Sequence, residues 1–92
     1  MLRVKVKYLN VYYSITHKKR EDIEFDGTLT LGELLDRVSC RYKSKFRDLI
    51  LDEDSKLKPH AWLLINQERE KDLQRELKDG EVIVFSLPIV GG

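Results

Sequence analysis

Hydrophobic and polar residues alternate with a period of two in the first part of the chain, and this pattern predicts β-strands. In residues 2–9 the alternation places three cationic side chains on one face and four apolar side chains on the other, those of Leu2, Val4, Val6 and Tyr8. Residues 22–26 alternate again and stop at an Asp-Gly pair. Two alternating strands so close in sequence predict an antiparallel hairpin, joined here by a loop that is longer than usual.

A helical period replaces the alternation after residue 29. Thr30 and Glu33 have the spacing of a capping box, in which each side chain accepts a hydrogen bond from the other residue's backbone N–H. The apolar residues then follow i, i+3, i+4 and i+7 spacing, at Leu31, Leu34, Leu35, Val38 and Tyr42. The pattern predicts one amphipathic helix that ends between residues 42 and 45. Residues 46–51 are expected to add a short turn or a second helical segment.

The second half of the chain predicts three more strands. Residues 62–65 are apolar, and residues 68–70 are expected to form a short partner strand. Residues 82–85 follow a Lys-Asp-Gly-Glu turn as a nearly continuous apolar run, which is typical of a central strand covered on both faces. The order of elements predicts an α+β fold, with one main helix packed on a mixed β-sheet and the first and last strands adjacent in its middle.

The composition of the chain mainly excludes some classes of protein and some kinds of site. The 92 residues fit one domain, and 17 Lys and Arg against 16 Asp and Glu leave a net charge of +1, which argues against a general nucleic-acid binder. The single cysteine, Cys40, excludes an internal disulfide framework and any multi-cysteine metal site. Because the N-terminus lacks a signal-peptide pattern and the apolar runs are too short to cross a bilayer, we expect a cytoplasmic protein with no membrane partner.

The C-terminal segment is the part of the sequence that indicates chemistry. We expect a folded domain over residues 1–87 and a flexible tail over residues 88–92, made of Pro88, Ile89, Val90, Gly91 and Gly92. A terminal Gly-Gly pair alone is often no more than a frayed end. Here a central strand runs directly into a short tail that ends on the two glycines. The glycines lack side chains and so fit a narrow channel, and the proline limits the conformations of the tail. This arrangement suits delivery of a terminal carboxylate into the active site of another protein.

With these features the sequence resembles the MoaD/ThiS family of ubiquitin-like sulfur carriers, and the resemblance covers essentially the whole chain. Three segments carry it: Val4-Lys5-Val6-Lys7-Tyr8 at the start, the run from Leu51 to His60 that leads to Ile65-Asn66, and Leu77-Lys78-Asp79-Gly80-Glu81-Val82 followed by a strand, a proline and Gly91-Gly92. The resemblance implies a β-grasp fold.

The resemblance also implies a function. An activating enzyme of the MoeB/ThiF type, using ATP and Mg, adenylates the carboxylate of Gly92, which is then converted to a thiocarboxylate, and Gly91 is its slim neighbour. The tail then enters the active site of a MoaE-like large subunit, with which the carrier forms molybdopterin synthase. The carrier itself has no catalytic residues, no metal and no stably bound cofactor. A ubiquitin-like protein modifier, or a sulfur carrier for tRNA thiolation, uses the same Gly-Gly end and is the alternative.

Three side chains near this chemistry need separate interpretation. In the last strand, Phe85 and Leu87 share one face, and one of the two faces must meet the helix. We assign Phe85 and Leu87 to partner binding, with a core position as the alternative for Phe85. Cys40 falls on the polar face of the predicted helix, which favours an exposed thiol with no role in sulfur transfer.

Overall fold

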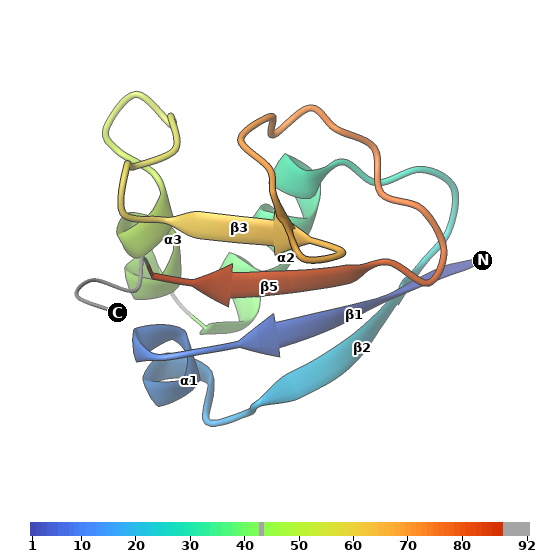
Figure 1. The fold of residues 1–92 in the computed structure, drawn as a ribbon, viewed down its shortest axis with the longest axis horizontal. Helices are drawn as coiled ribbons and strands as arrows, with labels where there is room; N and C mark the ends of the chain where they lie inside the picture. Colours follow the sequence, from blue (N-terminus) through green and yellow to red (C-terminus); the bar gives the residue numbers. More distant parts are fainter. Residues whose placement is uncertain (43, 88–92) are drawn as a thin grey trace.

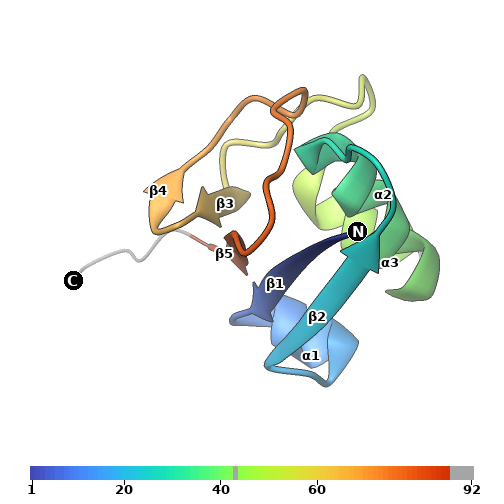
Figure 2. The ribbon, with the colours of Figure 1, turned by 90° about the vertical axis from the view of Figure 1, so that its right-hand side faces the viewer.

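The computed structural model describes residues 1–42 and 44–87. Five strands form one mixed sheet, and helices α2 and α3 pack on one of its faces (Figure 1, Figure 2). In chain order the elements are β1 (Leu2–Tyr8), α1 (Val11–Thr16), β2 (Arg20–Phe25), α2 (Leu31–Tyr42), α3 (Ser44–Ile50), β3 (Trp62–Ile65), β4 (Glu68–Arg69) and β5 (Val82–Ser86).

The order of strands across the sheet is β2-β1-β5-β3-β4. The first and last strands, β1 and β5, are parallel neighbours in the middle, with Lys5 opposite Val82 and Tyr8 opposite Phe85. The pairs β1–β2, β3–β5 and β3–β4 are antiparallel. The predicted mixed sheet, the predicted hairpin and the adjacency of the terminal strands are therefore confirmed.

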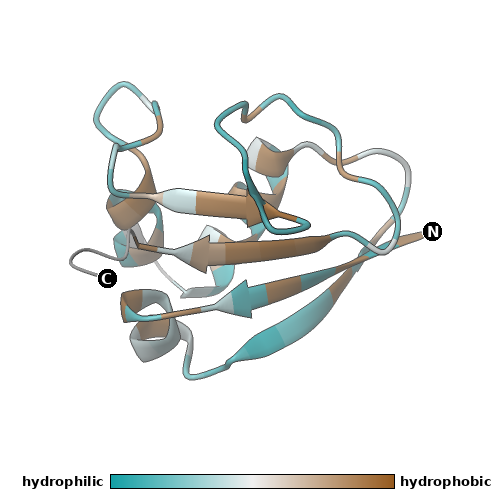
Figure 3. Cartoon of the chain, in the orientation of Figure 1, coloured by the Kyte–Doolittle hydropathy of each residue, from teal (hydrophilic) through white to brown (hydrophobic). Residues whose placement is uncertain are grey.

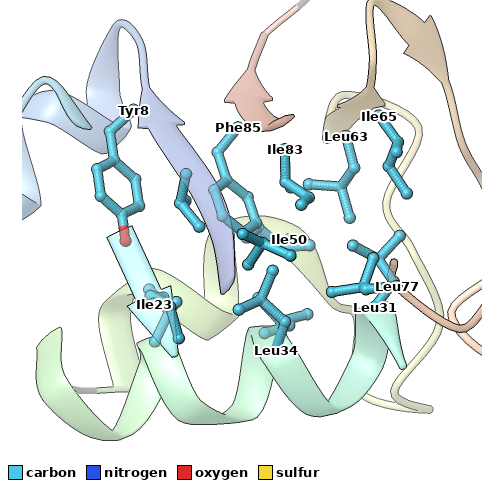
Figure 4. Packing of buried hydrophobic residues seen from close by; sticks show 14 of the residues in the cluster. Tyr8, Ile23, Leu31, Leu34, Ile50, Leu63, Ile65, Leu77, Ile83 and Phe85 are labelled. Carbon is cyan, nitrogen blue, oxygen red and sulfur yellow. The ribbon is translucent and has the colours of Figure 1, made fainter. Parts of the chain in front are cut away.

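Helix α2 begins with the predicted capping box. The Thr30 backbone N–H donates to the Glu33 carboxylate at 2.9 Å, and the Glu33 N–H donates to the Thr30 hydroxyl at 3.2 Å. The apolar stripe of the helix is buried from Leu31 to Val38 and half-buried at Tyr42. It packs against the strands together with Phe46 and Ile50 of α3, the second helical segment that the sequence predicts, and Figure 4 shows Leu31, Leu34 and Ile50 facing the strands. One continuous core thus lies between the sheet and the two helices.

The connection between β1 and β2 contains a short helix, α1, where the sequence predicts only a loop. Asn10 precedes it at φ 56°, and His17 closes it in the left-handed conformation at φ 60°, donating its N–H to the Tyr13 carbonyl. Tyr12 and Thr16 are buried one helical turn apart. Their spacing of four was the available signal for a helix, but it spans only one turn.

The two-residue turn between β3 and β4 has the conformation of a type I′ turn. Asn66 and Gln67 both have positive φ, 52° and 74°. The Asn66 side chain supports the turn, because its Oδ1 accepts from the Val82 N–H at 3.1 Å. Asparagine tolerates the left-handed region, whereas glutamine gains no such local hydrogen bond and keeps the steric cost of its Cβ.

Replacing Gln67 with glycine should therefore stabilise the protein. We expect the free energy of unfolding to rise by roughly 1 kcal/mol, because glycine adopts positive φ without the Cβ clash. Urea denaturation followed by circular dichroism measures the change. The Gln67→Ala variant is the matched control, since it shortens the side chain but keeps Cβ; an equal gain in both variants would show that backbone strain is not the cause.

Candidate functional site

The candidate site is built on β5, the central strand from which the C-terminal residues continue. The strand ends at Ser86, and Leu87 is the last residue that the structure describes. Five residues with predicted roles lie outside the described part of the chain, namely Pro88, Ile89, Val90, Gly91 and Gly92. The structure therefore describes the end of β5, which we call the root of the tail, and the surface beside it.

The start of β5 is held by a buried carboxylate. Glu81 is 6% exposed and accepts hydrogen bonds from the Arg75 guanidinium at 2.8 and 3.1 Å and from the Lys78 N–H at 2.7 Å. Asn66 Nδ2 adds a longer bond of 3.3 Å from the β3–β4 turn. The hydrogen bond from Arg75 is the main reason that the pKa of Glu81 lies below its usual range. The ionised carboxylate thus ties the preceding loop and the hairpin turn to the first residue of β5.

The end of β5 is held by aromatic packing. Phe85 is fully buried, and its ring lies parallel to that of Tyr8 with centroids 5.7 Å apart (Figure 4). The ring centroids of Phe85 and Phe46 are 5.2 Å apart in an edge-to-face arrangement. Leu9 then donates its N–H to the Phe85 carbonyl at 3.0 Å. The assignment of Phe85 to partner binding is wrong, because its side chain points toward the helices. Its role is to fix the root of the tail.

Hydrogen bonds to one carboxylate extend this anchor to β2 and α2. Glu21 accepts from the Tyr8 hydroxyl at 2.8 Å and from the Tyr42 hydroxyl at 2.7 Å, and it pairs with Arg41. Burial, followed by the bond to Glu21, raises the pKa of Tyr42 to about 12, and the same causes raise the pKa of Tyr8 further. Both phenols therefore stay neutral hydrogen-bond donors near neutral pH, and their bonds to Glu21 hold β1 and α2 against β2.

Leu87 lies at the boundary between the anchor and the surface. It is partly buried and packs against the core, and the Ser86 hydroxyl donates to its carbonyl at 3.1 Å. Its assignment to partner binding stays a prediction.

The sheet face opposite the helices is open and partly apolar. Val82 and Val84 of β5 and Trp62 and Leu64 of β3 are half-buried and point to this side, away from the core. The expectation that β5 is covered on both faces is therefore wrong: its continuous apolar run supplies one core face and one surface face. Figure 3 shows apolar colour on the neighbouring strands β3 and β5, whereas the edge strand β2, on the far side of β1, is polar. We call these four residues the apolar centre of the open face.

The surface around the apolar centre carries cations and further apolar side chains. The Arg69 guanidinium lies 4.5 Å from the centroid of the Trp62 ring, which places a positive charge at one margin. Lys7 borders a shallow hollow of about 290 Å³ on the other side, lined also by Val82 and Val84. Leu9 and Tyr13 are 45% and 44% exposed beside the end of β5. Sequence analysis missed this pair; the signal was that Leu9 continues the outward face of β1.

Other chemistry is sparse in the part of the chain that the structure describes. Cys40 is exposed on α2, as predicted. Within residues 1–42 and 44–87, no three His, Cys, Asp or Glu side chains gather to form a metal site. Across those same ranges, no helix combines the length and the apolar character that a membrane span requires.

Comparisons with known proteins find likeness in structure rather than in sequence. Neither a family model nor a curated protein sequence matches the chain. The solved structure of SAMP1 from Haloferax volcanii matches with a TM-score of 0.81 at 20% identity, covering 98% of this chain and 99% of that one. A putative molybdopterin converting factor, subunit 1, from Pyrococcus furiosus matches at 0.77 and 25% identity, covering 97% and 100%. The BexX/CysO complex from Amycolatopsis orientalis matches at 0.75 and 25%, covering 97% and 99%.

These likenesses confirm the predicted β-grasp fold, because the match covers almost the full length of both chains in each case. They also support the resemblance to the MoaD/ThiS family of ubiquitin-like proteins. They do not separate one member of that group from another, since identity stays between 20% and 25% for these three structures.

Proposed function

We propose that this ubiquitin-like chain is a sulfur carrier that donates sulfur from its C-terminal glycine in molybdopterin biosynthesis, as the small subunit of molybdopterin synthase. The observation that carries the proposal is the position of β5. This strand is the rigid centre of a β-grasp sheet, is fixed at both of its ends, and leads directly into a sequence that finishes in Gly91-Gly92. Likeness to a putative molybdopterin converting factor subunit favours this pathway.

The chemistry takes place at the carboxylate of Gly92. One carboxylate oxygen attacks the α-phosphorus of ATP, and pyrophosphate leaves with Mg. Hydrosulfide then attacks the acyl carbon of the adenylate, and AMP leaves with the original oxygen. The product is a thiocarboxylate whose sulfur is a nucleophile, held on the carrier rather than released into solution. A carboxylate resists direct attack, so activation by a phosphoryl group is required first.

The chain contributes position and reach. The anchored end of β5 limits the motion of the root, and the seven residues from Ser86 to Gly92 extend to at most about 25 Å. Gly91 and Gly92 add no side chain, so a narrow channel in the partner admits them. Partner enzymes supply the general bases and the metal ion, namely an activating enzyme of the MoeB/ThiF type and a MoaE-like large subunit. The complex of CysO with BexX supports the expectation that the carrier docks on an enzyme.

Mass spectrometry tests the proposal. The intact protein is incubated with a MoeB/ThiF-type enzyme, ATP, Mg and sulfide, and we expect a mass increase that corresponds to one oxygen replaced by one sulfur. Adding a MoaE-like subunit and the sulfur-free pterin precursor should return the carrier to its original mass as the pterin gains sulfur. A carrier that never gains the mass contradicts the proposal; one that gains it but does not pass sulfur to the pterin contradicts only the pathway.

A second function uses the same activated end. The likeness to the small archaeal modifier protein SAMP1 favours attachment of Gly92 to lysine side chains of other proteins. In that reaction the lysine amine displaces AMP or a thiol and forms an isopeptide bond. Western blots of cells that express a tagged chain distinguish the two functions, because a modifier forms a ladder of larger species that survives reducing denaturation. A carrier for tRNA thiolation would instead restore thiolated tRNA in cells that lack their own carrier.

Replacing Cys40 with serine should leave sulfur transfer unchanged. The thiol is exposed on α2, which packs on the sheet face opposite the apolar centre, so it lies on the outer side of the helix layer. We expect the same yield of thiocarboxylate and the same melting temperature as in the unchanged protein. Peptide mapping locates the added sulfur: finding it on Cys40, or losing the thiocarboxylate in the Cys40→Ser variant, would contradict the assignment of the chemistry to Gly92.

A further inference from the structure

The chain contains the dipeptide Asp-Gly twice, at residues 26–27 and at residues 79–80. An aspartate side chain reaches the backbone nitrogen of a following residue, and glycine has no side chain to shield that nitrogen. The local structure of the two pairs is similar, because all four residues are exposed and the glycines have φ 76° and 84°. The two pairs therefore allow a comparison in which the dipeptide is the same and the surrounding contacts differ.

The second Asp-Gly pair is held by the start of β1. The Gly80 N–H donates to the Arg3 carbonyl at 2.8 Å, and the Asp79 carboxylate accepts from the Arg3 N–H at 2.9 Å. Both bonds go to the same residue, so they fix the positions of the carboxylate and of the glycine nitrogen relative to each other. Both must break before the Asp79 side chain can react with the Gly80 nitrogen.

The first Asp-Gly pair lacks such contacts. Within residues 1–42 and 44–87, neither the Gly27 N–H nor the Asp26 carboxylate takes part in a hydrogen bond or an ion pair. The carboxyl group and the nitrogen are thus both available to react with each other.

We propose that Asp26 is a site of spontaneous isoaspartate formation and that the fold protects Asp79 from the same reaction. The Gly27 nitrogen bonds to the side-chain carboxyl carbon of Asp26, and the carboxyl hydroxyl group leaves as water together with the proton of that nitrogen. The product is a five-membered succinimide ring. Water then adds to the main-chain carbonyl carbon of Asp26 and breaks its bond to the nitrogen, which regains a proton. The backbone afterwards continues through the former side chain.

The fold can accommodate isoaspartate at this position. Phe25 at the end of β2 and Leu29 before α2 are both buried, and the exposed residues 26–28 connect them. Isoaspartate lengthens this connection by one backbone atom, and we expect both buried residues to keep their places. The inference goes beyond the proposed function, because the tail takes no part in the reaction.

The product is also a substrate for a class of enzyme. Isoaspartate exposes the former main-chain carboxyl group as a free carboxylate. A protein-isoaspartate methyltransferase transfers the methyl group of S-adenosylmethionine to an oxygen of this carboxylate and releases S-adenosylhomocysteine. Because residues 26–28 are exposed, we expect the modified chain to accept the methyl group while it is folded.

Peptide mapping of the full chain tests the inference. The protein is incubated below its melting temperature in slightly acidic buffer, which supplies the protonated carboxyl group, and is then digested. Electron-transfer fragmentation in the mass spectrometer distinguishes isoaspartate from aspartate at equal mass. We expect isoaspartate to form at least about tenfold faster at residue 26 than at residue 79, because two hydrogen bonds oppose the second reaction. A parallel incubation in urea removes the fold, and there the two sites should react at similar rates.

The Asp26→Glu variant is the matched control. Glutamate keeps the negative charge but has to close a six-membered ring, so isoaspartate at residue 26 and most of the methyl label from the methyltransferase should disappear while the melting temperature stays unchanged. If this variant melts lower, the comparison of the two sites in the unchanged protein still decides. Absence of isoaspartate at residue 26, equal rates at the two sites of the folded protein, or a difference that persists in urea overturns the inference. None of these results affects the proposed function, since sulfur loading is measured separately.

Discussion

Deletion of Gly91 and Gly92 should abolish sulfur loading while the domain stays folded. The described core residues end at Phe85, with Leu87 packed beside them, so the change in the free energy of unfolding should stay within about 0.5 kcal/mol. Sulfur loading is lost because the new terminal carboxylate, that of Val90, ends about 7 Å short of the position that the Gly92 carboxylate can reach. The new terminal residue also has a side chain, which glycine lacks. Pyrophosphate release and intact mass measure the two results.

Deletion of Gly92 alone separates reach from side-chain bulk. This variant still ends in glycine, but its carboxylate is about 3.5 Å short. We expect it to remain folded and to lose most of its adenylation. If either truncated protein is loaded with sulfur at the normal rate, the terminal carboxylate is not the reacting group.

Replacement of Phe85 with alanine should destabilise the protein by about 3–5 kcal/mol. The side chain is fully buried, and its removal leaves a cavity between the rings of Tyr8, Tyr12 and Phe46. Much of the stability of a small domain would be lost, so a large fall in the melting temperature and in the midpoint of urea denaturation is expected.

The Val84→Ala variant is the matched control on the same strand. Val84 is half-buried on the open face, so its truncation should cost roughly 1 kcal/mol of stability. It should raise KM for the activating enzyme, whereas Phe85→Ala acts through the fold. If Phe85→Ala kept its melting temperature and lost only partner affinity, the core assignment of Phe85 would be wrong.

Local patterns predicted most of the architecture. Alternation found β1 and β2, the capping box placed the start of α2 between Thr30 and Leu31, and the short apolar runs found β3 and β5. Each of these patterns involves only residues that are close together in the chain, so the sequence alone is enough to recognise it. Helix α1 was missed because six residues give too few turns for a period to stand out.

The face of β5 was harder to predict than the strand itself. Its residues are apolar at four successive positions, so alternation cannot distinguish the side of Phe85 from the side of Val84. Only the packing of α2 and α3 against one face decides which side is buried. The pairing of Lys7 on β1 with Arg20 on β2 was hidden for a related reason, since only the register between the two strands places these two cations opposite each other. The tail's chemistry, by contrast, rests on sequence and resemblance alone.

The central position of β5 has a consequence for the order in which the molecule assembles. Without β5, the remaining strands form two separate ribbons, β2–β1 and β3–β4, and each ribbon leaves one apolar edge unpaired. The contact that joins β1 to β5 spans almost the whole chain, from Lys5 to Val82, and such long-range closure is the slow step in folding small mixed domains. Insertion of this one strand completes the sheet, creates the middle of the open face and anchors the root of the tail together. Under the proposed function, an incompletely folded chain has no assembled face with which to present its terminal glycine, so loading with sulfur depends on the completion of folding.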